Sequence, residues 1–357
     1  MSSLTPETLA RLHPVHHMIL NFLAQSSPYT ILQLNKYYRR RVLPDLYHTL
    51  PVTQKSIWAF DVPGDGALRP HSVKYAKVLQ VVDVHSAILF ENYRLKVNGR
   101  LTFPIIRLLE RPIIPLVKRV EFFWAVVRDE YFFKFQHRMG NVNPEERTLY
   151  NEVQRGGQLR EALVHVDCSD ERARCTDDAL VEIGFLFSQN PVNVATTVVL
   201  HTDKCGLDYS PWCNHLPLQP ERILRFVLWL APEANEETGS TASCIPAASP
   251  YVLEDFAEFI IYVMDHVMDQ RREHGNRPEE EEDAAKEAGF VYPPEQLEVV
   301  CVDASLVEDL ARANFSPPKP LYSTSPPVEL EGFEWPIKFI ELDEKIALEY
   351  DLWNTKL

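Results

Sequence analysis

Four histidine and cysteine residues between positions 201 and 215 have the side chains and the close spacing that zinc requires. Three residues separate His201 from Cys205, and one residue separates Cys213 from His215. Zinc is bound by thiolates and imidazoles at short spacings, commonly with a Cys-x-x-Cys pair, which this stretch lacks. The spacing therefore favours an ordinary thiol-containing loop over a zinc site, and we predict no bound metal.

Three aspartates lie at the C-terminal ends of predicted strands, where α/β enzymes carry ligands and catalytic groups. They are Asp83, Asp167 and Asp303. A carboxylate there can bind a metal or act as a base, but it can also cap the next helix or start a turn, which we expect here. Carboxylates converging in one pocket would favour an enzyme, whereas carboxylates spread along the sheet edge would favour a receptor surface.

The motifs of several common enzyme classes are absent from the chain. It has no Gly-x-Ser-x-Gly, His-Glu-x-x-His or Gly-x-x-x-x-Gly-Lys sequence, which would indicate a hydrolase nucleophile, a zinc protease and a phosphate-binding loop. Glycine is scarce, at 12 residues, and this further disfavours nucleotide-binding loops. We predict no catalytic residue, no cofactor and no enzyme activity.

Seven short apolar runs are predicted to form the strands that would position the aspartate, histidine and cysteine side chains described above. Most are continuous rather than alternating, so both faces of the resulting sheet are expected to be covered. The predicted strands are 77–83, 118–124, 162–167, 196–200, 225–230, 298–303 and 337–342.

Helical patterns lie between several of these runs, and the clearest is at 252–272. The last one begins with Ser305-x-x-Glu308, the spacing of a capping box. Strand–helix–strand alternation requires parallel pairing, so the predicted fold class is α/β, an irregular βα array with mainly parallel strands. A compact domain with a mixed sheet is the alternative. The predicted helical segments are 85–110 in two pieces, 176–189, 252–272 and 305–313.

The N-terminal segment 12–53 has a pattern of its own. Three apolar blocks are interrupted by Ser26-Ser27-Pro28 and by the basic residues after Tyr38, and the third block runs from Val42 to Leu50. The spacing predicts three helices of about ten residues, which bury little surface alone. Such a unit is expected to pack against the next domain or against a partner.

At these residues the chain resembles an F-box. Ile19-Leu20-Asn21-Phe22-Leu23 is similar to the family's Ile-Leu-x-Phe-Leu helix, and Leu32 to Arg39 is similar to its second half. Leu43 to Leu50 resembles the Pro-x-Leu-Tyr segment of fungal members. The start departs from the family pattern, because Leu12-His13-Pro14 is one residue longer than Leu-Pro and lacks the acidic residue that usually follows.

The resemblance implies a three-helix F-box-like unit at 1–53 that docks on the Skp-type adaptor of a cullin-RING ubiquitin ligase. Residues 71–357 would form an α/β target-binding domain, similar to the degenerate leucine-rich arrays behind fungal F-boxes, and would hold an unidentified protein target. The alternative is a scaffold or enzyme with a helical cap. The implied adaptor contacts are Pro14, Val15, Ile19, Leu20, Phe22, Leu23, Leu32 and Leu34.

The composition of the chain indicates which classes of partner and which cellular compartment to expect. The net charge of −15 disfavours nucleic acid as a partner, because binding to it requires a basic face. No apolar run is long enough to cross a membrane, and six scattered cysteines favour free thiols in a reducing compartment. We expect a cytoplasmic or nuclear protein.

Mobile insertions are predicted near 137–160, 232–250 and 275–283. The proline-rich segment 316–328 is more typical of a stiff linker than of an SH3-type ligand.

Overall fold

The computed structural model describes most strands of the chain and the helices that pack on them. For residues 266–275 and Gln296 only the backbone is described. The described residues are Phe22, Arg40, 43–54, Ser56, 74–89, 114–129, 158–170, 194–202, 223–230, Ile245, 248–275, 296–315, Trp335, 337–350 and Leu352.

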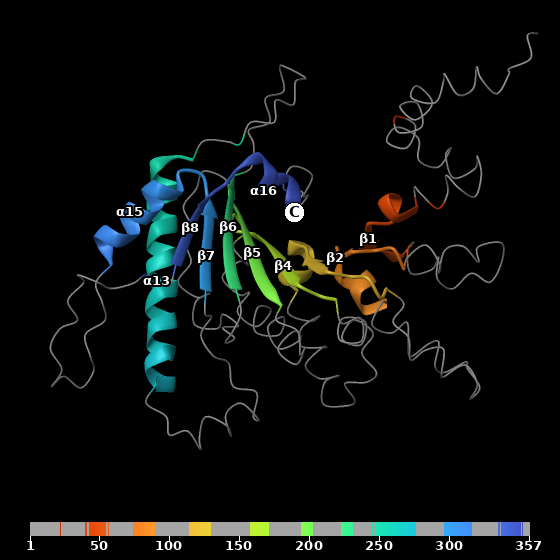
Figure 1. Cartoon of the computed structure of the whole chain (residues 1–357), viewed down its shortest axis with the longest axis horizontal. Helices are drawn as coiled ribbons and strands as arrows, with labels where there is room; N and C mark the ends of the chain where they lie inside the picture. Colours follow the sequence, from red (N-terminus) through yellow and green to blue (C-terminus); the bar gives the residue numbers. More distant parts are fainter. Residues whose placement is uncertain are drawn as a thin grey trace, which may run out of the picture.

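Eight parallel strands form one sheet, and they lie side by side in chain order (Figure 1). Each strand pairs with the one before it and the one after it, so β1 and β8 are the edges of the described sheet. All seven predicted runs are strands, which confirms the α/β class. The strands are β1 (Thr49–Val52), β2 (Val78–Val81), β3 (Arg119–Phe122), β4 (Glu161–Asp167), β5 (Ala195–Thr202), β6 (Ile223–Leu230), β7 (Gln296–Cys301) and β8 (Ile337–Glu341).

The sequence pattern placed Leu50 in a helix, and this was wrong. Residues 43–46 are helical, but the chain then turns, and Leu50 lies buried in β1 opposite Leu79 of β2. Pro51 is acceptable there because β1 is an edge strand, where a missing N–H costs no ladder hydrogen bond. The rest of the predicted three-helix unit, apart from Phe22 and Arg40, lies outside the described residues.

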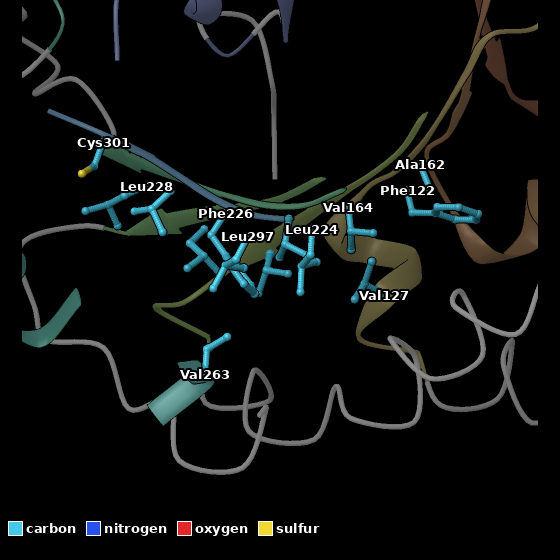
Figure 2. Close-up of a cluster of buried hydrophobic side chains, with 14 of the residues drawn as sticks. Phe122, Val127, Ala162, Val164, Leu224, Phe226, Leu228, Val263, Leu297 and Cys301 are labelled. Atoms are coloured by element: carbon cyan, nitrogen blue, oxygen red, sulfur yellow. The ribbon is translucent and has the colours of Figure 1, made fainter. Parts of the chain in front are cut away.

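One face of the sheet and its helices enclose the main core. The helices are α9 (Trp124–Val127), α13 (Pro250–Gly275) and α15 (Ala304–Asn314). In the apolar stripe predicted for 252–272, the described side chains from Val252 to Met264 are buried in this core, and the Phe259 and Phe226 rings meet edge to face with their centroids 5.0 Å apart. Figure 2 shows strand residues such as Phe122, Val164 and Phe226 on one side of the sheet, with Val263 of α13 pointing toward them.

The start of α15 differs from the predicted capping box. Its N-cap is Asp303, which is left-handed at φ 54° and makes no side-chain capping bond. The backbone N–H groups of Asp303 and Ala304 donate instead to the Glu341 carboxylate of β8, each at 2.9 Å. Glu308 pairs with Arg312 at 2.7 Å rather than with the cap. A carboxylate from the neighbouring strand therefore takes the role that the sequence assigned to Ser305.

The other predicted helices are described only in part. Residues 84–89 are helical, which agrees with the start of the predicted 85–110 segment, and 176–189 lies outside the described residues. None of the helices in the described part of the chain has the length and hydropathy to cross a bilayer.

Candidate functional site

The face of the sheet opposite α13, called the far face below, carries a row of polar side chains. Successive residues of a strand point to opposite faces, so strand residues next to those of the main core lie on the far face. Strand register places seven of these residues beside one another, one on each strand from β2 to β8, and all but Leu163 are polar. They are Gln80, Glu121, Leu163, Thr197, Arg225, Glu298 and Lys338.

The first half of this row is linked by ion pairs and hydrogen bonds centred on Arg119. Its Nε lies 2.8 Å from Glu121 Oε1, and its Nη1 lies 3.8 Å from Glu161 Oε2. Gln80 Nε2 donates to the other Glu121 oxygen at 2.7 Å. Glu121 is only 2% exposed, and a carboxylate that leaves water requires such partners to stay charged.

The second half is centred on Glu298. Arg225 Nε donates to Glu298 Oε2 at 2.7 Å, and Lys338 Nζ lies 3.5 Å from Glu298 Oε1. Glu298 is buried, whereas Lys338 is exposed. The guanidinium therefore provides the main compensation for the buried carboxylate, because an exposed ammonium is screened by water.

Tyr350 joins the two halves. It follows α16 (Glu344–Glu349), and its hydroxyl oxygen accepts a hydrogen bond from Arg225 Nη1. Thr197 lies beside the same hydroxyl, and its own Oγ1 donates to Glu161 Oε1 at 2.7 Å. Burial and the nearby Glu161 charge raise the pKa of Tyr350 to about 12, although Arg225 opposes this. The site therefore holds a neutral hydroxyl that accepts a hydrogen bond from Arg225.

Arg119 also contacts Tyr350 and the residue before it, Glu349. Its guanidinium carbon lies 5.7 Å from the centroid of the Tyr350 ring, and its Nη2 donates to the Glu349 carbonyl oxygen at 2.9 Å. A cation over an aromatic ring is attracted by the ring quadrupole. Arg119 thus recognises the ring and the backbone, while Arg225 recognises the hydroxyl.

Apolar contacts complete the attachment of this C-terminal segment, residues 342–352. Leu342, Ala347, Tyr350 and Leu352 pack on apolar far-face residues. The strand side of this second, smaller core is formed by Leu163, Val199, Val227, Trp229 and Val300.

The segment is shaped by local hydrogen bonds. Asp343 caps α16, because its Oδ1 accepts from Ile346 N at 2.8 Å. The helix ends where Leu352 N donates to Ala347 O at 3.0 Å. A helix of six residues is not stable alone in water, so its conformation depends on the far face.

Two buried histidines lie near the C-terminal ends of β4 and β5. His165 Nδ1 and His201 Nε2 are 3.0 Å apart, and the Phe123 ring centroid lies 5.0 Å from that of His165. Burial lowers the pKa of His201 to about 3, and burial together with the His201 charge lowers the pKa of His165. Both rings are therefore neutral, one donating its proton to the other.

One histidine of this pair, His201, belongs to the histidine and cysteine stretch 201–215 that was considered as a zinc site. His201 bonds to His165, which the sequence analysis had not paired with it. Cys205, Cys213 and His215 lie outside the described residues. Within the described residues, no three histidine, cysteine or acidic side chains are grouped as metal ligands.

The three strand-end aspartates do not converge. Asp83 accepts from Ser86 N at 2.7 Å and so caps helix 84–89, which confirms the expected role. Asp167 starts a turn by accepting from Ser169 N and Oγ at 3.0 and 2.6 Å. Asp303 is the N-cap residue of α15. Adjacent strands are about 4.8 Å apart, so the ends of β4 and β7, three strands apart, are separated by about 14 Å.

Sequence reasoning missed Arg119, Arg225, Glu298 and Tyr350. The available signal was a charged residue inside several of the apolar strand runs, such as Arg225 within 223–230. A charge in a strand covered on both faces needs a partner from a neighbouring strand. Only the register reveals which strand supplies it.

Of the predicted adaptor contacts, Phe22 is described, and it is helical and 67% exposed. The other seven, Pro14, Val15, Ile19, Leu20, Leu23, Leu32 and Leu34, lie outside the described residues.

Comparison with known proteins gives one match. A family model described as a protein of unknown function (DUF3760) matches residues 9–52, which overlap the N-terminal segment 12–53 and end at the last residue of β1. No curated protein and no solved structure matches the chain.

Proposed function

We propose that the protein is a target receptor of the F-box type. Its N-terminal segment would dock on the Skp-type adaptor of a cullin-RING ubiquitin ligase, and its sheet would hold a protein target. The observation that carries the proposal is the strand order, with eight parallel strands in the order of the chain. Repeat arrays such as leucine-rich solenoids have this order, because each unit packs only on its neighbours and the array offers an extended binding surface.

The placement of the acidic residues supports a receptor over an enzyme. A catalytic pocket of the kind considered above needs the carboxylates of Asp83, Asp167 and Asp303 close together, yet their strands are not adjacent. Asp83 and Asp167 are engaged by backbone N–H groups nearby. Each of these two carboxylates therefore has a local structural role.

The proposed docking surface is apolar. Phe22 exposes two-thirds of its surface on a helix, and an exposed aromatic side chain is the type of residue that anchors interfaces. The family match supports treating residues 9–52 as a segment that occurs in other proteins.

The alternative role for this segment is a structural cap. The chain passes directly from helix 43–46 into the edge strand β1, and solenoids need a cap at each end. In that case the N-terminal helices would shield β1 and bind no adaptor. A binding measurement separates the two roles.

The experiment is co-purification of the full chain with a Skp-type adaptor, comparing Phe22→Asp and Leu23→Asp with the unaltered chain. Truncating a central anchor costs 2 kcal/mol or more, so we expect binding to weaken about 30-fold or more while the circular dichroism spectrum is unchanged. Tyr251→Asp is the matched control, because Tyr251 is a 78% exposed aromatic residue on α13. Absence of binding by the unaltered chain, or full binding by both aspartate variants, would contradict the proposal.

A further inference from the structure

The C-terminal segment is separate from the main core. Among the described residues, every member of the core between the sheet and α13 comes from positions before 342. The segment packs only in the smaller core on the far face. The sheet and its helices therefore do not depend on this segment for their principal packing.

The segment is bound along one side and exposed along the other. Ala347, Tyr350 and Leu352 face the strands and are buried, whereas Leu348 is 69% exposed and Glu344 is also exposed. A short peptide bound to a receptor surface has this same distribution. Figure 1 shows α16 beside the upper ends of the central strands.

The contacts with Tyr350 select a particular chemistry. Arg225 donates to the hydroxyl oxygen of Tyr350. A phenylalanine would leave Arg225 Nη1 without this partner. A phosphotyrosine would place about two negative charges beside Glu161 in a buried site.

The charges around the site are already balanced. Arg119, Arg225 and Lys338 face Glu121, Glu161 and Glu298. A neutral polar group is therefore the ligand that this row accepts without leaving an unpaired buried charge.

We propose that the far face is a binding site for a short helical peptide segment that carries an unphosphorylated tyrosine. The C-terminal segment occupies this site in the free protein, and a segment of the same chemistry in a target displaces it. That the displacing peptide belongs to a target protein rests on the proposed receptor function. The pattern Ala347-x-x-Tyr350-x-Leu352 defines its class as small apolar, tyrosine and leucine at these spacings.

The tethered segment competes strongly with any free peptide. A tethered ligand has an effective concentration in the millimolar range, so a free peptide should bind poorly to the unaltered protein. Substitution of Tyr350 should weaken binding of the C-terminal segment to the far face, so that the site becomes free in an otherwise complete chain.

The test uses the full chain carrying Tyr350→Ala and a fluorescently labelled peptide with the sequence of residues 343–357, without any adaptor. Fluorescence anisotropy should show peptide binding at least tenfold tighter to Tyr350→Ala than to the unaltered chain. Peptides with phenylalanine or phosphotyrosine at the position of Tyr350 should bind at least tenfold more weakly than the tyrosine peptide. Adding Arg225→Met to the variant should abolish the preference for tyrosine over phenylalanine.

Circular dichroism checks that the variants fold. Tyr350→Phe keeps the ring and replaces Tyr350→Ala if the alanine variant does not fold. Failure of the tyrosine peptide to bind the folded variant, or equal binding of the three peptides, overturns the proposal and would mean that the segment is a permanent part of the fold. Because no adaptor is present, failure of adaptor docking refutes the F-box proposal alone.

Discussion

The His165–His201 pair predicts that part of the stability of the protein is lost when the pH falls from 7.5 to 5.5. The two rings are buried in the neutral state, and burial lowers the pKa of both. The unfolded chain protonates its histidines near pH 6.5, whereas the folded chain does not protonate His201 until about pH 3. Below pH 6.5 the unfolded state therefore binds more protons, and folding is disfavoured as the pH decreases.

The magnitude follows from the pKa difference. At pH 5.5, one unit below the unfolded value and well above the folded value, His201 alone lowers the free energy of unfolding by about 1.4 kcal/mol. His165 acts in the same direction. The variant His165→Asn/His201→Gln keeps amide nitrogens near the bonded positions and removes both titrating rings.

The assay is urea unfolding at pH 7.5 and 5.5, followed by the fluorescence of the buried Trp124 and Trp229. The loss of unfolding free energy between the two pH values should be smaller in the double variant by about 1.4 kcal/mol or more. Carboxylate contributions are common to both proteins and cancel in this comparison. His85→Gln, at an exposed position, should behave like the unaltered chain. An equal loss in the double variant and the unaltered chain would refute the neutral buried pair.

Three further substitutions test the packing, the helix cap and the polar row by the same urea titration at pH 7.5. Phe226→Ala should lower the free energy of unfolding by about 3–5 kcal/mol, because it leaves a cavity in the main core; a cost below about 1 kcal/mol would contradict this packing. Asp83→Ala should cost about 0.5–2 kcal/mol, and Asp83→Asn should restore most of it because asparagine also caps; equal costs would argue against the cap. Glu298→Ala should cost about 2 kcal/mol by removing the charged acceptor of Arg225, and a neutral result would show that Tyr350 and water satisfy the guanidinium.

Most of the sheet was predictable because its strands are short, continuous apolar runs. Runs such as 196–200 and 225–230 are confined to strand length and rich in β-branched or aromatic residues. The edge strand β1 was missed because Leu50 continues a helical spacing from Leu43 and Leu46, and Pro51 argues against a strand. Pairing with β2 overrides that local pattern.

The far-face network was not predictable, because it depends on which strands are neighbours. Glu161 and Thr197 are 36 positions apart, and Arg225 and Glu298 are 73 apart. No spacing rule connects such pairs before the strand order is known. The same limit applies to His165 and His201, which are also 36 positions apart.

The hydrogen bond from Arg119 to the Glu349 carbonyl spans 230 positions, and this distance has a consequence for protein synthesis. A chain that leaves the ribosome from its N-terminus can pair each new strand with the strand made just before it, because the sheet follows chain order. The charged side chains of the far face, on β3 to β8, are then all present while Tyr350 is not yet available. These charged side chains stay in contact with water until Tyr350 has emerged. A stop codon shortly after Asp343 would therefore yield a chain with every strand present and the charged row uncovered.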